Sequence, residues 1–170
     1  PVPRGFSLLL LTIKNAFLRP RHLFRAFSRR RYRTGVASGK TVFFLNAFSR
    51  LRFDLLYAHF GPNGLSGAFL KDIGVAPRLA VAFHGSDINT YPKRFGEDVY
   101  SYMFTRCDLV TANTNFTAEK VMAAGATKEQ MTLVPESLRT DEYPTRTWTP
   151  RDHGFRVLTV GRMVEKKGHR

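Results

Sequence analysis

The chain has 170 residues, 43% of them hydrophobic, which suffices for one globular domain of ordinary size. Its formal net charge is +14, but residues 1–52 hold 12 of the 27 Lys and Arg residues and no Asp or Glu, so the basicity is concentrated there. The single cysteine, Cys107, excludes a disulfide framework and a thiolate zinc site and favours a cytoplasmic protein.

Residues 1–52 are predicted to form a basic, amphipathic helical segment. From Phe6 to Phe27 leucine, isoleucine and phenylalanine alternate with Lys and Arg, and Pro20 divides the stretch, so two short helices are expected. Such helices bind at a membrane interface, with cations on anionic lipid and the apolar face among the acyl chains. The alternative is that the Leu/Phe face packs on the domain. The longest apolar run, Leu8 to Leu11, is far too short to span a bilayer.

Residues 53–150 alternate short apolar runs with polar loops and helical stretches. Four strands are expected, at Asp54–Ala58, Leu79–Phe83, Cys107–Ala112 and Met131–Pro135. Helices are expected over Leu65–Ile73 and Phe116–Gly125, with Gly125 as a helix stop. This alternation predicts an α/β fold with a Rossmann-like parallel sheet, and ligands of such sheets bind at the carboxyl ends of the strands.

Applied to the first three strands, this rule selects eight candidate residues for the rim of a cleft: His59, Gly61, Asn63, Gly64, His84, Gly85, Asp87 and Asn113. Gly61 and Gly64 would let the backbone approach a ligand, although a plain tight turn around Pro62 and Asn63 is the alternative. His84 is the candidate catalytic residue, as hydrogen-bond donor or general acid/base. Asp87 is either a rim residue or the cap of the helix that follows it.

The last twenty residues, 151–170, are predicted to begin a second domain. An apolar-alternating run, Phe155 to Thr159, is expected to be its first strand, and the sequence VGRMVEKKG follows from Val160 to Gly168. A strand that delivers Gly161, Arg162 and Lys167 to its carboxyl end presents cations and amides to a diphosphate. Because one strand cannot bury its own apolar face, the chain is expected to be a fragment of a longer protein.

Other chemistries fit the sequence poorly. The five histidines show no i,i+4 pairing of the metal-ligand kind, and neither a G-x-S-x-G elbow nor a G-x-x-x-x-G-K-[ST] loop occurs. A metalloenzyme and a hydrolase with a serine triad are therefore not expected. A nucleotide-dependent transferase remains compatible with the motifs.

Four motifs in order carry a family resemblance: the turn from Ala58 to Gly64, HGSD at His84 to Asp87, DVYSYMFTRCDLVTANTNF at Asp98 to Phe116, and VGRMVEKKG at Val160 to Gly168. Together they resemble the retaining glycosyltransferases of family 4, also called group 1. Within that family the chain is most similar to the bacterial exopolysaccharide and colanic-acid-type branch. The resemblance covers roughly residues 53 to 170, and four ordered motifs are far more specific than any one.

The resemblance implies a GT-B fold, with an acceptor domain facing a nucleotide-sugar donor domain across a cleft. Residues 1–52 and 53–150 would belong to the acceptor domain, and residues 151–170 would begin the donor domain. Arg162 and Lys167, with Gly161, match the positions that stabilise the departing donor diphosphate, and His84 matches the histidine near the reacting sugar. The implied enzyme is a hexosyltransferase of polysaccharide biosynthesis that acts with retention, uses a nucleotide-diphosphate sugar and a saccharide or lipid-linked acceptor, and needs neither metal nor cofactor. It would be cytoplasmic, or peripheral on the cytoplasmic membrane face.

Two departures from the family pattern accompany the resemblance. After the fourth strand the family usually carries a Gly and an Asp, whereas this chain has Glu136, Ser137, Leu138 and Arg139. The family's first strand with its glycine-rich loop is expected before Pro1, and its paired glutamates after Arg170, so the 170 residues are expected to be inactive alone.

Two alternatives stay open: a basic module that binds nucleic acid or an anionic surface on an α/β scaffold, and a different GT-B enzyme with the same diphosphate-binding residues. Nucleic acid is not the expected partner, because the basic segment lacks stacking aromatics and a groove-reading motif.

Overall fold

A computed structural model of the protein describes residues 5–143 and 157–168. The chain divides into two compact units, one up to Glu136 and one from Ser137 onward, and each is described by itself. The domain boundary expected between residues 150 and 151 lies outside the described residues.

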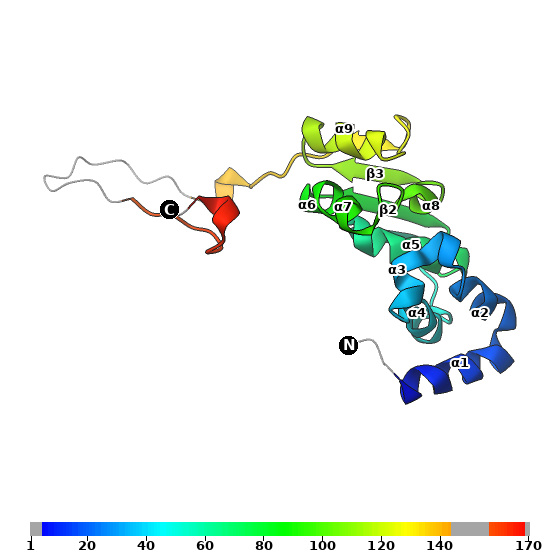
Figure 1. Cartoon of the computed structure of the whole chain (residues 1–170). Helices are drawn as coiled ribbons and strands as arrows, with labels where there is room; N and C mark the ends of the chain where they lie inside the picture. The colour runs from blue at the N-terminus through cyan, green and yellow to red at the C-terminus, as the bar shows by residue number, and fades with distance from the viewer. Residues whose placement is uncertain (1–4, 144–156, 169–170) are drawn as a thin grey trace, which may run out of the picture. The chain divides into compact units, whose positions relative to one another are not determined.

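The first unit is built on a parallel four-stranded sheet in the sequential order β1-β2-β3-β4 (Figure 1). The pairing aligns Ala58, Val81, Val110 and Met131 across the sheet. The α/β, Rossmann-like class predicted from the sequence is thereby confirmed, and all four strands lie within three residues of their predicted bounds. The strands are β1 Leu55–His59, β2 Arg78–Phe83, β3 Leu109–Ala112 and β4 Met131–Leu133.

Helices follow the strands and bury one face of the sheet. Side chains of Leu79, Val81 and Phe83 point to this face and join a core with residues of α5, α8 and α9. On β1 the opposite face is exposed and carries Leu55 and Tyr57. The helix α9 begins after the capping residue Thr114 and ends before Gly125, which has a φ of 114° and so confirms the predicted stop. The helices are α5 Gly61–Asp72, α6 Ser86–Asn89, α7 Tyr91–Phe95, α8 Ser101–Phe104 and α9 Asn115–Ala123.

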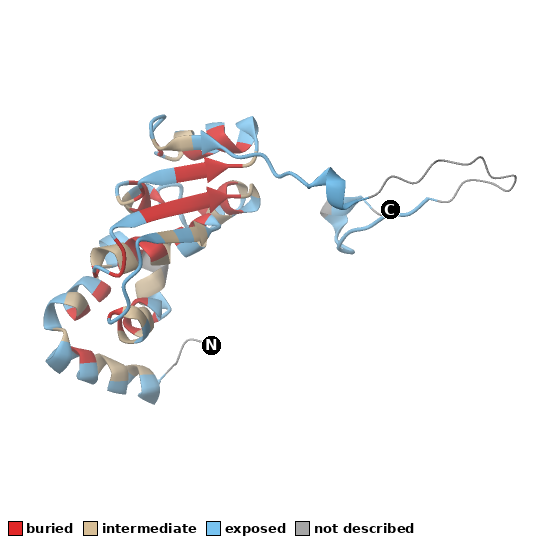
Figure 2. Ribbon diagram, turned by 180° about the vertical axis from the view of Figure 1, so that it is seen from behind, coloured by how far each residue is buried: buried red, intermediate tan, exposed pale blue. Residues whose placement is uncertain are grey.

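The described residues of the basic segment, 5–52, form four further helices, which make a group beside α5 (Figures 1 and 2). The two helices predicted between Phe6 and Phe27 are present, and Pro20 opens the second of them as expected. A second apolar core, which includes Leu23, Leu45 and Phe69, joins this group to α5. The four helices are α1 Phe6–Leu18, α2 Pro20–Ala26, α3 Arg29–Ala37 and α4 Lys40–Phe48.

A polar junction at Asp72 ties the helical group to α5 and to the segment that contains α8. Its carboxylate, almost fully buried, forms an ion pair with Arg106 at 2.7 Å and accepts hydrogen bonds from the hydroxyls of Tyr32 and Tyr102. Burial and the nearby Asp72 raise the pKa of the Tyr32 hydroxyl above its ordinary value. The Arg25 guanidinium also donates to the Asp72 carbonyl, at 2.6 Å. A buried carboxylate needs such partners, so this junction fixes how α2 and α3 sit on α5.

The second unit contains little regular structure in its described residues. It has two short 3-10 turns, Thr140–Glu142 and Glu165–Lys167. The predicted strand Phe155–Thr159 is not found in its described part: residues 157–159 are irregular, and Val157 and Leu158 are almost fully exposed. A strand requires a neighbouring strand for its backbone hydrogen bonds, and no described residue supplies one here. Among the described helices of both units, none is long and apolar enough to cross a bilayer.

Candidate functional site at the carboxyl ends of the strands

Four polar side chains come together where the four parallel strands end. His59 is the last residue of β1, His84 follows β2 directly, Asn113 follows β3, and Glu136 lies three residues beyond β4. Sequence reasoning predicted the first three as rim residues, and the structure brings them together. It missed Glu136, which was noted only as a departure from a family pattern. The same strand-end rule, applied to the fourth strand, would have selected it.

His84 lies at the centre of this group, which we call the strand-end cluster: His59, His84, Asn113 and Glu136. Its Nδ1 is 3.3 Å from Oε1 of Glu136, and its Nε2 is 3.2 Å from Nδ1 of His59. The two imidazoles stack with their centroids 5.4 Å apart. Asn113 donates its Nδ2–H to the same Glu136 oxygen at 3.3 Å, so the carboxylate joins two strand ends.

The hydrogen-bond roles follow from what each atom can do. The Glu136 carboxylate only accepts, so Nδ1 of His84 carries the hydrogen that is donated to it. With His84 neutral, its Nε2 accepts from the Nδ1–H of His59. When His59 moves aside, that Nε2 is free to accept a proton or hydrogen bond from a hydroxyl group of a ligand. The cluster therefore has the groups needed for proton transfer or for recognition of sugar hydroxyls.

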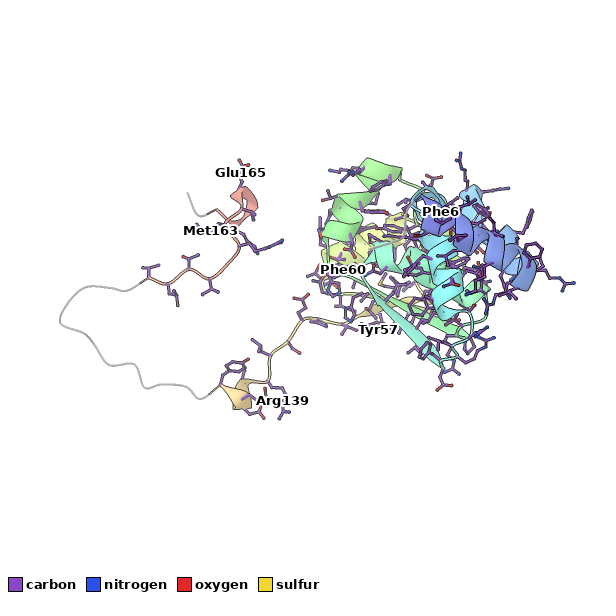
Figure 3. All side chains as sticks on the ribbon, turned by 90° about the horizontal axis from the view of Figure 1, so that it is seen from below. Phe6, Tyr57, Phe60, Arg139, Met163 and Glu165 are labelled. Atoms are coloured by element: carbon purple, nitrogen blue, oxygen red, sulfur yellow. The ribbon has the colours of Figure 1, made fainter. Side chains whose placement is uncertain are left out.

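Aromatic rings pack beside the two histidines. The centroid of the Phe60 ring lies 4.6 Å from that of His84, and the centroid of the Tyr57 ring lies 4.7 Å from that of His59. Figure 3 labels Tyr57 and Phe60 among the side chains of the first unit. Phe60 has a φ of 72°, the only positive φ at a non-glycine among the described residues. Such a conformation is costly for a bulky residue, and its backbone N–H is held by the Ala82 carbonyl at 2.8 Å. Strained backbone of this kind is concentrated at functional sites, which supports a functional reading of this edge.

Asp87 is a buried residue whose hydrogen bonds hold the backbone of the strand-end cluster in place. Its side chain is 5% exposed, and its carboxylate accepts from the backbone N–H groups of His84, at 3.1 Å, and of Gly61, at 3.0 Å. Its carbonyl accepts from the Tyr100 hydroxyl at 2.8 Å. Burial first, and then the Asp87 charge, raise the pKa of Tyr100 above its ordinary value, so the hydroxyl stays protonated and donates.

Of the two roles left open for Asp87, that of cap of the following helix is wrong. The N-cap of α6 is Gly85, with a φ of 102° and no side-chain cap. Asp87 instead satisfies the first N–H of α5, which precedes it in the chain, because the carboxyl ends of β1 and β2 are neighbours. It connects the backbone of the candidate catalytic histidine to the start of a neighbouring helix.

Gly61 and Gly64 have a packing role that the sequence did not predict. The sequence predicted a turn around Pro62 and Asn63 followed by a helix from Leu65. In the structure α5 already begins at Gly61, so both glycines lie within the helix. A Cβ atom at Gly61 would lie 2.6 Å from the Phe83 ring, and one at Gly64 would lie 2.5 Å from Sδ of Met103. The two glycines therefore let α5 approach β2 closely, because core side chains occupy the space that a Cβ at either position would need.

Asn63 and Gly85 complete the predicted rim. Asn63 is exposed and donates its Nδ2–H to the His59 carbonyl at 2.8 Å, which fixes the end of β1. A Cβ at Gly85 would meet nothing closer than 3.9 Å, so the glycine is required by its φ of 102° and not by crowding. Asn113 Oδ1 is buried and has no hydrogen-bond partner among the described residues.

The predicted diphosphate-binding residues Gly161, Arg162 and Lys167 lie in the second unit. Each is exposed, and Lys167 ends a 3-10 turn that is followed by Gly168 at a φ of 67°. Because each unit is described by itself, a common site for these residues and His84 stays a prediction.

Comparison with known proteins gives partial matches. A protein of Escherichia coli K12 named "Putative colanic acid biosynthesis glycosyltransferase WcaL" is 28% identical to the chain over 119 residues, 69% of this chain and 29% of the relative. The protein of that name in Salmonella typhimurium LT2 is 27% identical over 118 residues, 68% of this chain. The chain thus spans less than a third of the length of these relatives. No family model and no solved structure matches it. The matches support a relationship to glycosyltransferases of polysaccharide synthesis.

Proposed function

We propose that the chain is part of a glycosyltransferase that moves a hexosyl group from a nucleotide-diphosphate sugar to a saccharide or lipid-linked acceptor, with retention, in polysaccharide biosynthesis. The observation that carries the proposal is the strand-end cluster, in which His84 is held between His59 and Glu136 at the carboxyl edge of a parallel sheet. This edge is where such sheets bind ligands, and the relatives named above are glycosyltransferases by name.

In this proposal His84 touches the reacting sugars. Its Nδ1–H is occupied by Glu136, so Nε2 is the atom that binds a hydroxyl of donor or acceptor once His59 gives way. Glu136 and Asp87 are positioning residues: the first fixes the ring through its hydrogen bond, and the second fixes the His84 backbone. The Phe60 ring packs against the imidazole at an interplanar angle of 48°.

Arg162 and Lys167 have a different role in the proposed reaction. As the bond between the sugar C1 and the donor diphosphate breaks, the diphosphate leaves with the electron pair and gains negative charge. The two cations would stabilise that charge, and we propose that they do so without a metal ion. We propose that the enzyme acts in the cytoplasm, at the membrane if the acceptor is lipid-linked.

The test uses the complete reading frame of the source gene that contains this chain. Purified protein is incubated with labelled nucleotide sugars and a lipid extract of the source cells, in the presence and absence of EDTA. The proposal predicts a labelled glycan whose new linkage has the anomeric configuration of the donor, formed equally in EDTA. Release of free sugar without transfer, or inversion at C1, would contradict it.

Two matched variants separate the diphosphate role from a general charge effect. Arg162→Gln is expected to lower kcat by about 10² to 10³, the usual cost of removing one donor that stabilises transition-state charge. Arg139→Gln is the control, because Arg139 lies in the same unit and forms only exposed ion pairs with Asp141 and Glu142. Equal kcat values for the two variants would overturn the assignment of Arg162.

A further inference from the structure

A pocket of about 270 Å³ lies in the first unit between α4, α5 and α7. This volume is just below the range of about 300 to 1,000 Å³ that drug-sized ligands fill, so it suits a ligand of about one sugar ring. The pocket is lined mainly by apolar and aromatic side chains, among them Phe44, Leu65, Tyr91 and Phe95. None of the described residues that line it is acidic.

The polar end of the pocket is the N-terminus of α4, where positive charge is left unbalanced. Ser38, Lys40 and Thr41 all line the pocket. The helix begins at Lys40 after Gly39, which has no side chain to accept from the free amides, and its first turn contains no acidic residue. The first amides of a helix carry partial positive charge, which repels a lysine at that end. An anion bound here would interact favourably with both the amides and Lys40.

Thr41 gives a second, independent indication of a ligand. It is 4% exposed, and its Oγ1 is buried without a hydrogen-bond partner among the described residues. A threonine hydroxyl inside a helix often donates to the carbonyl four residues earlier, as Thr12 does to Leu8 at 2.8 Å, but Thr41 does not. A buried hydroxyl left unpaired is costly, so a polar ligand atom beside Thr41 would be bound favourably.

The walls and the polar end together indicate the chemistry of the ligand. The Tyr91 and Phe95 rings pack with their centroids 4.4 Å apart, and Phe95 is 37% exposed. One face of a pyranose ring presents C–H groups, which pack on aromatic rings, while its hydroxyls can bond with Thr41. An acyl chain would cover the rings but would leave the Thr41 hydroxyl and the α4 amides unpaired. A sugar ring that carries an anionic group satisfies all of these features.

The pocket lies close in the chain to both histidines of the strand-end cluster. Pro62, which lines the pocket, is in the first turn of α5, shortly after β1 and His59. The helix α7 contributes Tyr91 and Phe95 and is separated from His84 by the short helix α6. A glycan bound at His84 therefore has a sugar-sized pocket beside the first turn of α5.

We propose that the pocket binds one pyranose unit of the acceptor, a unit that carries a carboxylate or a phosphate. The ring packs against Tyr91 and Phe95, the anionic group lies at Lys40 and the first amides of α4, and a hydroxyl pairs with Thr41. That the sugar is part of the acceptor rests on the proposed function, whereas its binding requires neither donor nor transfer.

The test is saturation-transfer NMR on the protein encoded in the complete reading frame, without nucleotide sugar. The probes are methyl glucoside, methyl glucuronide and glucose 1-phosphate, which carry no charge, a carboxylate and a phosphate. For ligands of this size a Kd of about 1 mM is expected for the better anionic probe, and binding of the neutral probe should be about twofold to fivefold weaker. The tighter of the two anionic probes identifies the anionic group.

A pair of lysine variants tests the charge at the start of α4. Lys40→Gln should weaken binding of the anionic probe about twofold to fivefold and leave the neutral probe unchanged. Lys128→Gln is the matched control, because Lys128 is also exposed and does not line the pocket, and it should bind all probes as the wild type does.

Two variants at one position test the hydroxyl. Thr41→Val keeps the shape of the side chain and removes the hydroxyl, so it should bind the sugars about twofold to tenfold more weakly. Thr41→Ser keeps the hydroxyl and should bind them as the wild type does. Because the hydroxyl has no partner among the described residues, Thr41→Val should unfold at the same or a higher urea concentration than the wild type. A loss of binding in this variant is therefore not a loss of folding.

Three results would overturn the proposal. Equal affinities of Thr41→Val and Thr41→Ser would show that the hydroxyl does not touch the sugar. Tighter binding of dodecanoate by Thr41→Val than by the wild type would make an acyl chain the occupant. Sugar transfer by a protein that binds none of the three probes, even well above the expected Kd, would refute the pocket and leave the proposed function intact. Binding that depends on Thr41 and Lys40 in a protein without transfer activity would instead uphold the pocket while the proposed function fails.

Discussion

Asp87 offers the sharpest test of how the strand-end cluster is held. Replacing it with alanine removes the acceptor of two backbone N–H groups, that of Gly61, which is buried, and that of His84, which is partly buried. A buried donor left without a partner costs about 1 to 3 kcal/mol, and a partly buried donor costs less because water reaches it. We therefore expect Asp87→Ala to lower the free energy of unfolding by roughly 3 kcal/mol.

Urea unfolding followed by circular dichroism measures this change. Asp87→Asn should lower the free energy of unfolding less than Asp87→Ala, because the amide oxygen still accepts one of the two hydrogen bonds. It should still destabilise the chain, because the amide NH₂ group cannot accept from the second N–H. The matched control is Asp54→Ala: Asp54 is exposed just before β1, and its substitution should change the free energy by less than about 0.5 kcal/mol. If Asp87→Ala unfolds at the same urea concentration as Asp54→Ala, the carboxylate does not hold the start of α5, and the account of the cluster fails.

Two further predictions concern groups buried in the first unit. Burial raises the pKa of the Cys107 thiol to about 12. At pH 8 the folded chain should therefore react with a thiol reagent at least about 100 times more slowly than the urea-unfolded chain. Equal rates would place the thiol outside the core. The pKa values of Tyr32 and Tyr100 are raised above 10.0 by burial and nearby carboxylates. The unfolded chain therefore loses these protons first, so the contribution of the two tyrosines to the free energy of unfolding should be constant below pH 10 and fall as the pH rises above it. The raised pKa of the Cys107 thiol adds a decline that begins near pH 9.0. Tyr32→Phe should make the decline above pH 10 shallower, and an unchanged slope in urea titrations between pH 8 and 11 would contradict the assignment.

The sheet could be predicted because its signals are local. A parallel strand buried on one or both faces appears as a short apolar run, and the four runs from Asp54 to Pro135 each contain a strand. The strand-end rule then placed His59, His84 and Asn113 at one edge without any structure. Pro20 and Gly125 marked helix boundaries through their own backbone preferences.

What the sequence could not show depends on partners distant in the chain. The carboxylate of Asp87 accepts from the N–H of Gly61, 26 residues earlier, whereas capping rules consider only the following residues and so offered the wrong helix as one of its two roles. Position 64 requires glycine because a Cβ there would clash with Met103 and Val81. Only the packing of α5 on β2 in the folded chain brings these side chains near. For α1, periodicity identified apolar residues but could not show that Leu8, Leu11 and Asn15 face the protein while Phe6 and Phe17 are exposed.

The most direct test of the central claim is the effect of His84→Ala on sugar transfer by the protein encoded in the complete reading frame. His22→Ala is the control, since it removes a histidine on α2 that has no contact with the strand-end cluster among the described interactions. The account predicts that His84→Ala lowers kcat/KM by about 10² or more while His22→Ala keeps the wild-type value. Equal kcat/KM for the two variants would show that sugar transfer, if it occurs, takes place away from the strand ends, and would contradict the account.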